Sequence, residues 1–345
     1  MNARRDWLIP LVPLYGAVVV AKRRMYELGW RRTNRLPSPV ISVGSVSAGG
    51  AGKTPMVAML AGILRRRGYA VSILTRGYGR SSSLVERVEP YDDPGWHGDE
   101  PVLLAQRAGV PVFAGADRYR AGMLAEQDER GDRVAVHLLD DGFQHQRLAR
   151  NVNIVMLTLE DVGDCLLPAG NLREPISAVS RADVVAVREE EANQLKGTLD
   201  ELQSMGNGFV VWRVRRSLSL AEGGETLPTL PLAFCGIARP DNFTQMLKGS
   251  RYEPLDTVAF PDHHAYDERD MAKLLERARQ KGANGFVTTE KDAVKLTPVL
   301  RERLEAVGPV IVARLQVDLV NEKEAMAELV GMVSELDRRK ASERS

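Results

Sequence analysis

A glycine-rich segment at residues 44–55 constrains the fold of this chain more than any other part of the sequence. It reads Gly-Ser-Val-Ser-Ala-Gly-Gly-Ala-Gly-Lys-Thr-Pro. It follows the apolar run 39–43 and precedes residues 56–67, where apolar side chains recur at helical spacing. A buried strand, a glycine-rich turn and a helix that opens on Lys-Thr are typical of a P-loop, whose backbone N–H groups surround a phosphate. The sequence therefore predicts an α/β fold that binds a nucleotide.

The residues of this loop indicate how the phosphates would be held. The lysine of such a loop reaches the β- and γ-phosphate oxygens, and the hydroxyl that follows binds Mg²⁺. These roles fall to Lys53 and Thr54. The usual pattern, Gly-x-x-x-x-Gly-Lys-Thr, has a glycine where Ser47 stands, and a glycine turn without a ligand is the alternative interpretation. The candidate nucleotide-binding residues are Ser47, Ala48, Gly49, Gly50, Ala51, Gly52, Lys53 and Thr54.

Composition limits the class of protein. At 345 residues the chain is long for one domain, so two domains are expected. Its apolar content of 44% is that of a globular protein, and its net charge of +1 argues against a nucleic-acid partner. Cys165 and Cys235 lie far apart without metal-ligand spacing. This separation predicts that both thiols are buried, that the protein is in a reducing compartment and that no structural zinc is bound.

The amino-terminal segment 1–36 is basic and apolar. The apolar run 7–21 has only fifteen residues and two prolines, so it is too short to span a bilayer, which needs about 20. A signal peptide fits poorly, because no convincing cleavage site follows the run. We expect an interfacial segment that contacts lipid; a helix packed on the protein's own core is the alternative. Two acidic residues, Asp6 and Glu27, stand against eight basic ones: Arg4, Arg5, Lys22, Arg23, Arg24, Arg31, Arg32 and Arg35.

After the P-loop helix, apolar runs alternate with helical patterns. This alternation predicts a parallel sheet covered by helices on both faces, with ligands at the carboxyl ends of its strands. The expected strands are 70–74, 111–114, 134–139, 152–157 and 184–187, and the expected helices are 100–107 and 117–128.

A second α/β alternation follows a change in pattern. Residues 208–215 alternate and are predicted to be antiparallel, and the polar stretch 217–229 is predicted to be a linker. The fold is therefore a P-loop parallel sheet sandwiched by helices, with a second, smaller α/β domain joined by a short β linker. The expected later strands are 232–236, 255–260, 285–289 and 309–317, with helices at 268–281 and from about 321. The predicted divisions are 1–36, 37–207, 208–230 and 231–345, and the last helix is free to pack back on the first domain.

Carboxylates end one of the predicted strands. The strand 134–139 leads into Asp140 and Asp141, which resembles a Walker B element that holds Mg²⁺ or its waters. Many strands end in aspartate, so the interpretation depends on the P-loop that precedes it. Together they predict Thr54 with Asp140 or Asp141 as the metal-binding residues.

Seven sequence blocks, in the same order along the chain, resemble those of the tetraacyldisaccharide 4′-kinases, the lipid A 4′-kinases of Gram-negative bacteria. In that family a threonine or serine replaces the first P-loop glycine, which accounts for Ser47. The blocks are Val43 to Pro55, Thr75-Arg76-Gly77-Tyr78-Gly79, Gly98-Asp99-Glu100-Pro101, Asp140-Asp141-Gly142-Phe143-Gln144-His145, Leu172-Arg173-Glu174-Pro175, Asp262-His263-His264 and Thr289-Glu290-Lys291-Asp292-Ala293.

The resemblance implies a reaction in lipid A biosynthesis. The γ-phosphate of ATP would pass, with Mg²⁺, to the 4′-hydroxyl of an acylated glucosamine disaccharide 1-phosphate. The protein would act at the cytoplasmic face of the bacterial inner membrane, on its lipid surface, with no nucleic acid and no obligate protein partner. Such a transfer depends on positioning and charge neutralisation.

The resemblance also assigns catalytic residues. Asp99 matches the family's general base, His263 matches the partner that tunes it, and Lys53 would hold phosphate. From the residues alone, Asp99 reads as a helix N-cap and His263 as a loop histidine. A pair split between two domains would assemble only when the domains close. The candidates for contact with substrate or phosphate are Arg76, Arg118, Arg173 and Glu174, the last two expected to pair at the domain junction.

Two other classes of protein remain open on the sequence alone. One is a P-loop nucleotide switch or metallochaperone, although no metal-carrying cysteine or histidine motif is present. The other is a soluble small-molecule kinase, in which residues 7–21 would belong to the core.

Overall fold

The computed structural model describes residues 5–128, 131–206, 208–220 and 227–342. Over these residues, twelve strands form one sheet in the order β10-β9-β11-β12-β8-β7-β6-β1-β5-β2-β4-β3. Neighbouring strands are parallel except for the pairs β8–β12 and β3–β4. The strands are β1 Val40–Ser45, β2 Ala70–Thr75, β3 Glu86–Val88, β4 Val112–Ala114, β5 Ala135–Asp140, β6 Val152–Leu157, β7 Val184–Arg188, β8 Val210–Ser219, β9 Pro231–Cys235, β10 Asp256–Ala259, β11 Gly285–Thr289 and β12 Val310–Leu319.

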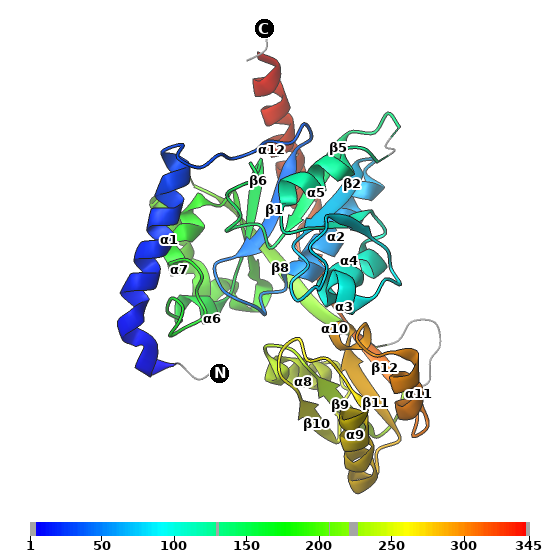
Figure 1. Ribbon diagram of the computed structural model, residues 1–345. Coiled ribbons are helices and arrows are strands. Elements are labelled where there is room, and N and C mark those ends of the chain that lie inside the picture. Colours follow the sequence, from blue (N-terminus) through cyan, green and yellow to red (C-terminus); the bar gives the residue numbers. More distant parts are fainter. Residues whose placement is uncertain (1–4, 129–130, 207, 221–226, 343–345) are drawn as a thin grey trace.

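Helices cover both faces of this sheet (Figure 1). The helices are η1 Asp6–Leu11, α1 Val12–Glu27, α2 Lys53–Arg66, α3 Pro94–His97, α4 Asp99–Ala108, α5 Arg118–Ala125, α6 Leu159–Val162, η2 Ile176–Arg181, η3 Glu189–Glu191, α7 Ala192–Ser204, α8 Pro240–Gly249, α9 Glu268–Lys281, α10 Glu290–Ala293, α11 Pro298–Glu305 and α12 Glu322–Ser342. The predicted α/β fold with a mostly parallel sheet is confirmed.

The strand β1 lies in the middle of the sheet, between β6 and β5, and is buried along its whole length. On one face, Ile41 and Val43 pack with α2, α4 and α12 in the largest hydrophobic cluster. On the other face, α7 covers β6 and β7, and α5 packs beside Val40 and Leu74. Because β1 is buried on both faces, its carboxyl end and the turn that follows are held firmly in place.

The molecule has two lobes (Figure 1). The P-loop lobe contains β1–β8 with α2–α7 and α12. The second lobe contains β9–β11 with α8–α11, around clusters that include Phe234, Phe286 and Leu274. The strand β12 belongs to both lobes, because residues 310–313 pair with β11 and residues 314–319 pair with β8. The predicted division into domains stays a prediction.

The strand β8 corrects one expectation. It is antiparallel to β12 but parallel to β7, so the antiparallel prediction for 208–215 is wrong on the β7 side. An alternating pattern shows that one face is more exposed; it does not fix the direction of the neighbour. Of the polar stretch 217–229, residues 221–226 lie outside the described part. Cys235 is buried as expected, whereas Cys165 is only half-buried.

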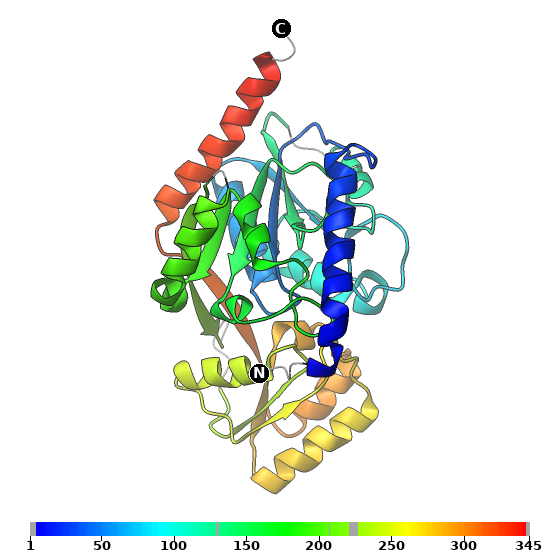
Figure 2. The same ribbon diagram turned by 90° about the vertical axis from the view of Figure 1, so that its left-hand side faces the viewer.

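The amino-terminal helix α1 lies along the outside of the P-loop lobe (Figure 2). Tyr15 on this helix donates a hydrogen bond to the carbonyl of Arg173 at 3.2 Å, which ties the helix to the body. Its remaining apolar side chains are mostly exposed, so α1 is not a core helix. In the described part of the chain, no helix has the length and apolar character needed to cross a membrane. Arg4, one of the eight basic residues, lies outside that part.

Candidate active site

The turn between β1 and α2 has the backbone of a phosphate cradle. Gly49, Gly50 and Gly52 have φ angles of 78°, 69° and 88°, in a region that residues with a Cβ rarely adopt. The helix α2 then begins at Lys53, whose Nζ lies 3.2 Å from Oγ of Ser45 at the end of β1. The lysine therefore reaches back along the turn. Such a turn presents backbone N–H groups and a positive charge to an anion.

The first carboxylate, Asp140, lies beside this cradle because β5 pairs with β1, with Asp140 opposite Val43. The side chain is only 2% exposed. Its Oδ2 accepts a hydrogen bond from Thr75 at 3.3 Å, whereas Oδ1 is buried and has no hydrogen-bond partner among the described residues. Burial, together with the charges of Glu100 and Asp141, raises the pKa of Asp140 to about 7. A cation at Oδ1 would satisfy this carboxylate.

The second carboxylate, Asp141, is held between two cations. Its Oδ2 lies 2.6 Å from Nη1 of Arg173, and its Oδ1 lies 3.4 Å from Nζ of Lys53. Burial would raise the pKa of Asp141, but the charges of Lys53 and Arg173 outweigh burial and hold it below its usual value. Asp141 has a φ of 49°, which turns the chain sharply after the strand. It therefore stays ionised, and it joins Lys53 to Arg173.

These residues fit a magnesium ion that is shared with a nucleotide. Thr54 is buried in the first turn of α2, and Asp140 offers a buried oxygen without a partner. Magnesium in proteins usually takes one or two carboxylates and completes its shell with phosphates and water. Consistent with this, no group of three or more His, Cys, Asp or Glu side chains in the described residues could hold a metal ion by itself. Thr54 and Asp140 are the residues that would hold the ion.

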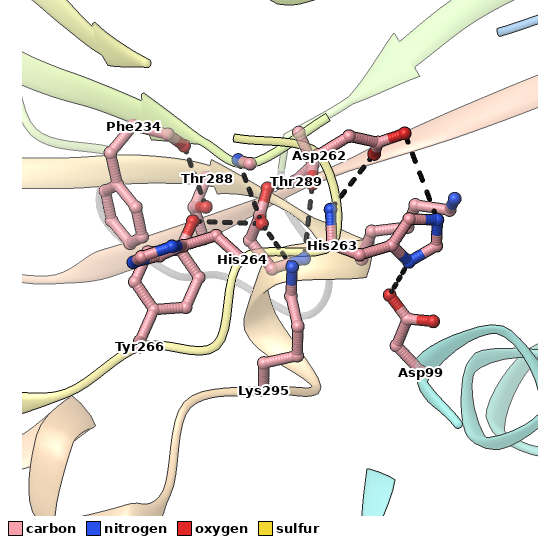
Figure 3. A network of polar contacts seen from close by, with 12 residues as sticks. Asp99, Phe234, Asp262, His263, His264, Tyr266, Thr288, Thr289 and Lys295 are labelled. Atoms are coloured by element: carbon pink, nitrogen blue, oxygen red, sulfur yellow. Dashed lines mark hydrogen bonds and ion pairs between the residues drawn. The ribbon is translucent and has the colours of Figure 1, made fainter. Parts of the chain in front are cut away.

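A glycine places Asp99 at the start of α4. Gly98 has a φ of 94°, and a Cβ on it would lie 2.9 Å from the carbonyl oxygen of Tyr78. Only glycine allows α4 to begin this close to the turn that follows β2. The buried carboxylate of Asp99 accepts the backbone N–H of Glu100 at 2.9 Å through Oδ1. Its Oδ2 lies 2.8 Å from Nδ1 of His263 in the other lobe (Figure 3).

The two members of this pair shift each other's proton affinity. The hydrogen bond to Asp99 raises the pKa of His263 above its usual value, although burial and the charge of Lys291 oppose the shift. Burial raises the pKa of Asp99, but the hydrogen bond to His263 and the charges of Lys291 and Lys295 together bring it below its usual value. When His263 is protonated, the pair is therefore an ion pair.

A buried network holds the loop that carries His263 (Figure 3). His263 has a φ of 59°, unusual for a residue with a side chain, and its N–H donates to the carbonyl of Gly236 at 3.2 Å. Asp292, with no exposed surface, accepts the N–H of Gly236 at 3.0 Å and the hydroxyl of Tyr266 at 2.9 Å. Nζ of Lys295 lies 2.9 Å from the same carboxylate. Asp292 thus joins the end of β9 to the far end of the His263 loop.

Two further ion pairs join α4 to the second lobe. Lys291 lies 2.6 Å from Glu100, and Arg107 lies 2.9 Å from Glu290. Arg107 also donates to the carbonyl of Leu315 on β12 at 2.8 Å. Glu100 and Arg107 therefore join Asp99 as side chains of α4 that contact the second lobe.

The other candidate residues have different surroundings. Arg76 is exposed. Arg118 is buried and donates to the carbonyl of Ala116 at 3.0 Å; burial and the charge of Arg76 lower its pKa to about 10. Arg173 and Glu174 do not pair with each other, so that expectation is wrong: Arg173 binds Asp141, and Glu174 forms an ion pair with Arg181. Each of the two charges is already neutralised by a side chain from another element: Asp141 follows β5, and Arg181 ends η2.

Three residues near the site received no role from the sequence. Lys291 and Asp292 lie in a block that resembled the family, but the sequence alone does not show what they contact. Arg239 follows the carboxyl end of β9 and precedes Pro240, the first residue of α8. Since ligands gather at the carboxyl ends of parallel strands, a charged residue there was a signal that could have been used.

Comparison with known proteins gives a consistent result. The family model described as Tetraacyldisaccharide-1-P 4′-kinase matches residues 4–334. A tetraacyldisaccharide 4′-kinase from Koribacter versatilis is 38% identical over 331 residues, covering 94% of this chain and 98% of that protein. A second one, from Geobacter metallireducens, is 38% identical over 323 residues, covering 90% of this chain and 92% of that protein.

A solved structure is similar along nearly the whole chain. The crystal structure of the "apo" form of LpxK from Aquifex aeolicus in complex with ATP has a TM-score of 0.73 and 30% sequence identity. The similarity covers 95% of this chain and 99% of that one. The family model, the relatives and the structure agree over most of their lengths. This chain therefore belongs to the tetraacyldisaccharide-1-P 4′-kinase family.

Proposed function

We propose that this chain is an ATP-dependent kinase of lipid A biosynthesis that phosphorylates the 4′-hydroxyl of a tetraacyldisaccharide 1-phosphate. The observation that carries the proposal is the Asp99–His263 pair, formed between the lobes in a chain that also has the phosphate cradle. A nucleotide-binding loop is common to many proteins, whereas a buried carboxylate held by a histidine supplies the base that a hydroxyl acceptor requires.

The cradle residues account for nucleotide binding. The backbone of residues 49–54 and the ammonium of Lys53 would hold the β- and γ-phosphates of ATP. Thr54 and Asp140 would hold Mg²⁺, with Asp141 keeping Lys53 in place. When bound, the ion neutralises negative charge on the phosphates. Ser47, Ala48 and Ala51 shape the loop; the N–H of Ala48 donates to the carbonyl of Asn171 at 2.8 Å and fixes its outer side.

Asp99 is the proposed acceptor of the proton. The bond between the γ-phosphorus and the β,γ-bridging oxygen of ATP breaks, and its electrons stay on ADP. The 4′-oxygen of the sugar forms the new bond to phosphorus and loses its proton to Asp99. This step requires an ionised Asp99, and burial with the His263 hydrogen bond holds the carboxylate in one orientation.

His263 would set the basicity of Asp99. While His263 is protonated, its charge stabilises the carboxylate anion and makes it a poor proton acceptor. Once His263 is neutral, Nδ1–H still orients Oδ2 of Asp99, and the carboxylate regains basicity. The active form is therefore ionised Asp99 with neutral His263.

The acceptor would approach through basic side chains. Arg76 is exposed and is the residue most available to an approaching phosphate. Arg173 would act through Asp141, and the buried Arg118 and Glu174 would support the surrounding turns.

A membrane location suits this substrate. Large apolar side chains on the amino-terminal segment face solvent, among them Trp7, Leu14, Val18 and Trp30. Lys22, Arg24, Arg31 and Arg32 are exposed on the same segment. An apolar surface flanked by arginines is typical of peripheral binding to anionic lipid. We infer that α1 rests on the cytoplasmic face of the inner membrane, where it would bring the cradle to an acylated substrate.

A transfer assay tests the proposed function. The full-length protein is mixed with γ-labelled ATP, Mg²⁺ and the acylated disaccharide 1-phosphate, and the lipid is extracted. Label in a doubly phosphorylated lipid is expected with the wild type, and little with Asp99→Asn. Label only in inorganic phosphate would contradict the proposal and favour a nucleotide switch. Equal transfer to a water-soluble sugar would favour a soluble small-molecule kinase.

A further inference from the structure

The second lobe touches the phosphate loop at Ala238 and Arg239. A Cβ placed on Gly50 would lie 2.7 Å from Nε, 2.8 Å from Cδ and 3.0 Å from Cζ of Arg239. A Cβ on Gly49 would lie 3.5 Å from Cβ of Ala238. The guanidinium group of Arg239 therefore lies directly against the backbone of the loop, where Gly50 has no side chain to keep it away.

The position of Arg239 is set by both lobes. In the chain, Arg239 follows β9 and the turn at Gly236, and the next residue, Pro240, begins α8. Its guanidinium forms an ion pair with Glu160 on α6, which follows the carboxyl end of β6. Since β6 is the direct neighbour of β1, this carboxylate is presented at the same edge of the sheet as the phosphate loop.

The ion pair with Glu160 is suited to exchange. The side chain of Glu160 is 49% exposed, and such pairs contribute little to stability in water. A phosphate offers more charge and a matching pair of oxygens to a guanidinium group, so it competes well with one exposed carboxylate. An arginine already seated on the loop needs only a small side-chain movement to change partners.

We propose that Arg239 is a catalytic residue contributed by the second lobe, whose guanidinium leaves Glu160 to contact the β- and γ-phosphates of the bound nucleoside triphosphate. The inference rests on the proposed function for the identity of the nucleotide. Arg239 neutralises charge on the transferring group and on the leaving diphosphate, as an arginine supplied to other phosphoryl-transfer sites does. It reaches the phosphates only when the second lobe is docked, just as His263 reaches Asp99 only then. Nucleotide binding and lobe docking are thereby coupled through Arg239.

Binding measurements test this role independently of turnover. The dissociation constants of ATP and ADP are measured by calorimetry for full-length wild type, Arg239→Met and Arg239→Lys. Loss of a charge-assisted contact to the γ-phosphate is expected to weaken ATP about tenfold or more. Affinity for ADP should fall less, so the ratio of the two constants changes. Arg239→Lys should recover part of the ATP affinity, which also excludes misfolding as the cause.

Turnover and two further variants complete the test. Arg239→Met should lower kcat about 10³-fold. Arg279→Met, an exposed arginine on α9 in the same lobe, is the matched control and should behave as wild type. Glu160→Gln removes the resting partner and should leave ATP affinity unchanged or higher. Two results would show that Arg239 is only a structural link. One is an Arg239→Met protein with the wild-type kcat and the wild-type ratio of ATP to ADP dissociation constants. The other is a Glu160→Gln protein that loses as much ATP affinity as Arg239→Met does. The two dissociation constants are measured without the disaccharide. A failure of this proposal can therefore be distinguished from a failure of the wild type to phosphorylate the disaccharide.

Discussion

Nδ1 of His263 lies 2.8 Å from Oδ2 of Asp99, although 164 positions separate the two residues in the chain. Asp99 begins a helix of the P-loop lobe, whereas His263 belongs to a loop of the second lobe. Neither lobe contains the pair by itself. The proposed base therefore reaches its working state only when the lobes are docked. While the lobes are apart, no assembled pair is available to activate a water molecule for attack on the γ-phosphate, and closure excludes water from the site.

Replacing Asp99 by Asn should remove the base without removing its contacts. The amide oxygen can still accept Nδ1–H of His263, so the docking of the lobes is preserved. We expect kcat to fall about 10²- to 10⁴-fold, the usual contribution of a general base. Affinity for ATP, measured by calorimetry, should stay close to that of the wild type. A variant with nearly normal kcat would remove Asp99 from the proposed role.

The pH–rate profile should report the proton on His263. Its pKa is raised by the hydrogen bond to Asp99, by the charge of Asp99 and by Asp262, against burial and Lys291; the ring of Tyr78 also packs beside it. Since the neutral imidazole is the active form, kcat/KM should rise with pH, with its midpoint above the ordinary value of about 6.5.

The variant His263→Gln provides the comparison for this profile. Without the imidazolium, the acid limb should depend on Asp99 itself, whose pKa is held low by Lys291 and Lys295 as well. The acid limb of the kcat/KM profile should therefore move to lower pH, and the plateau value of kcat/KM should be lower than that of the wild type. A limb at the same pH in both proteins would show that His263 is not the titrating group.

Removing the hydroxyl of Tyr266 should loosen the loop that carries His263. Tyr266→Phe deletes the 2.9 Å hydrogen bond to Asp292, at a cost of about 0.5–1.5 kcal/mol in stability. We expect kcat to fall clearly while KM for ATP changes little, because the nucleotide cradle belongs to the other lobe. Tyr252→Phe is the control: it removes a 3.1 Å hydrogen bond to the carbonyl of Pro228 in the same lobe, a bond that does not involve Asp292. Equal kcat in the two variants would show that the network only stabilises the fold.

The sequence predicted most elements whose pattern is local. The helix 268–281 was predicted to the residue, because Asp267 forms a capping box at its start and Gly282 ends it with a φ of 67°. The strands β6 and β11 were equally clear. The partner of β8 was not predictable, since pairing direction depends on where the chain returns through β12. The helices α7, α8 and α11 were missed. The helices α8 and α11 have only ten and eight residues, so each offers few turns in which a repeating apolar pattern can be recognised.

The site was predicted unevenly for a similar reason. Lys53, Thr54, Asp140 and Asp141 follow strands of one sheet, so topology alone brings them together. Asp99 and His263 became candidates only through the resemblance to a family. The support from Asp292 and the position of Arg239 on Gly50 depend on how the lobes dock, which no local pattern encodes.

Gly44 should be indispensable for the position of the aspartate turn. A Cβ on it would lie 2.5 Å from Cβ and 2.8 Å from the backbone nitrogen of Phe143, which follows Asp141 closely. Gly44→Ala therefore forces this turn away from β1. It should lower the free energy of unfolding, measured with urea, by about 1–3 kcal/mol. A Cβ on Gly197 of α7 would have no atom within 4 Å, so Gly197→Ala should raise the free energy of unfolding by about 1 kcal/mol. A Gly44→Ala protein as stable as the wild type would contradict the packing of this turn.

A charge on α1 should weaken membrane binding. Val18 on α1 and Val299 on α11 are both 59% exposed, so Val18→Glu and Val299→Glu change solvent-exposed apolar surface to a similar extent. If α1 rests on lipid, Val18→Glu buries a carboxylate in the headgroup region beside anionic lipid and should lower the bound fraction strongly. Val299→Glu should float as the wild type does. The measurement is flotation of full-length protein with vesicles of phosphatidylethanolamine and phosphatidylglycerol. Equal flotation of the two variants would place the lipid contact elsewhere, and equal loss would show that net charge alone governs binding.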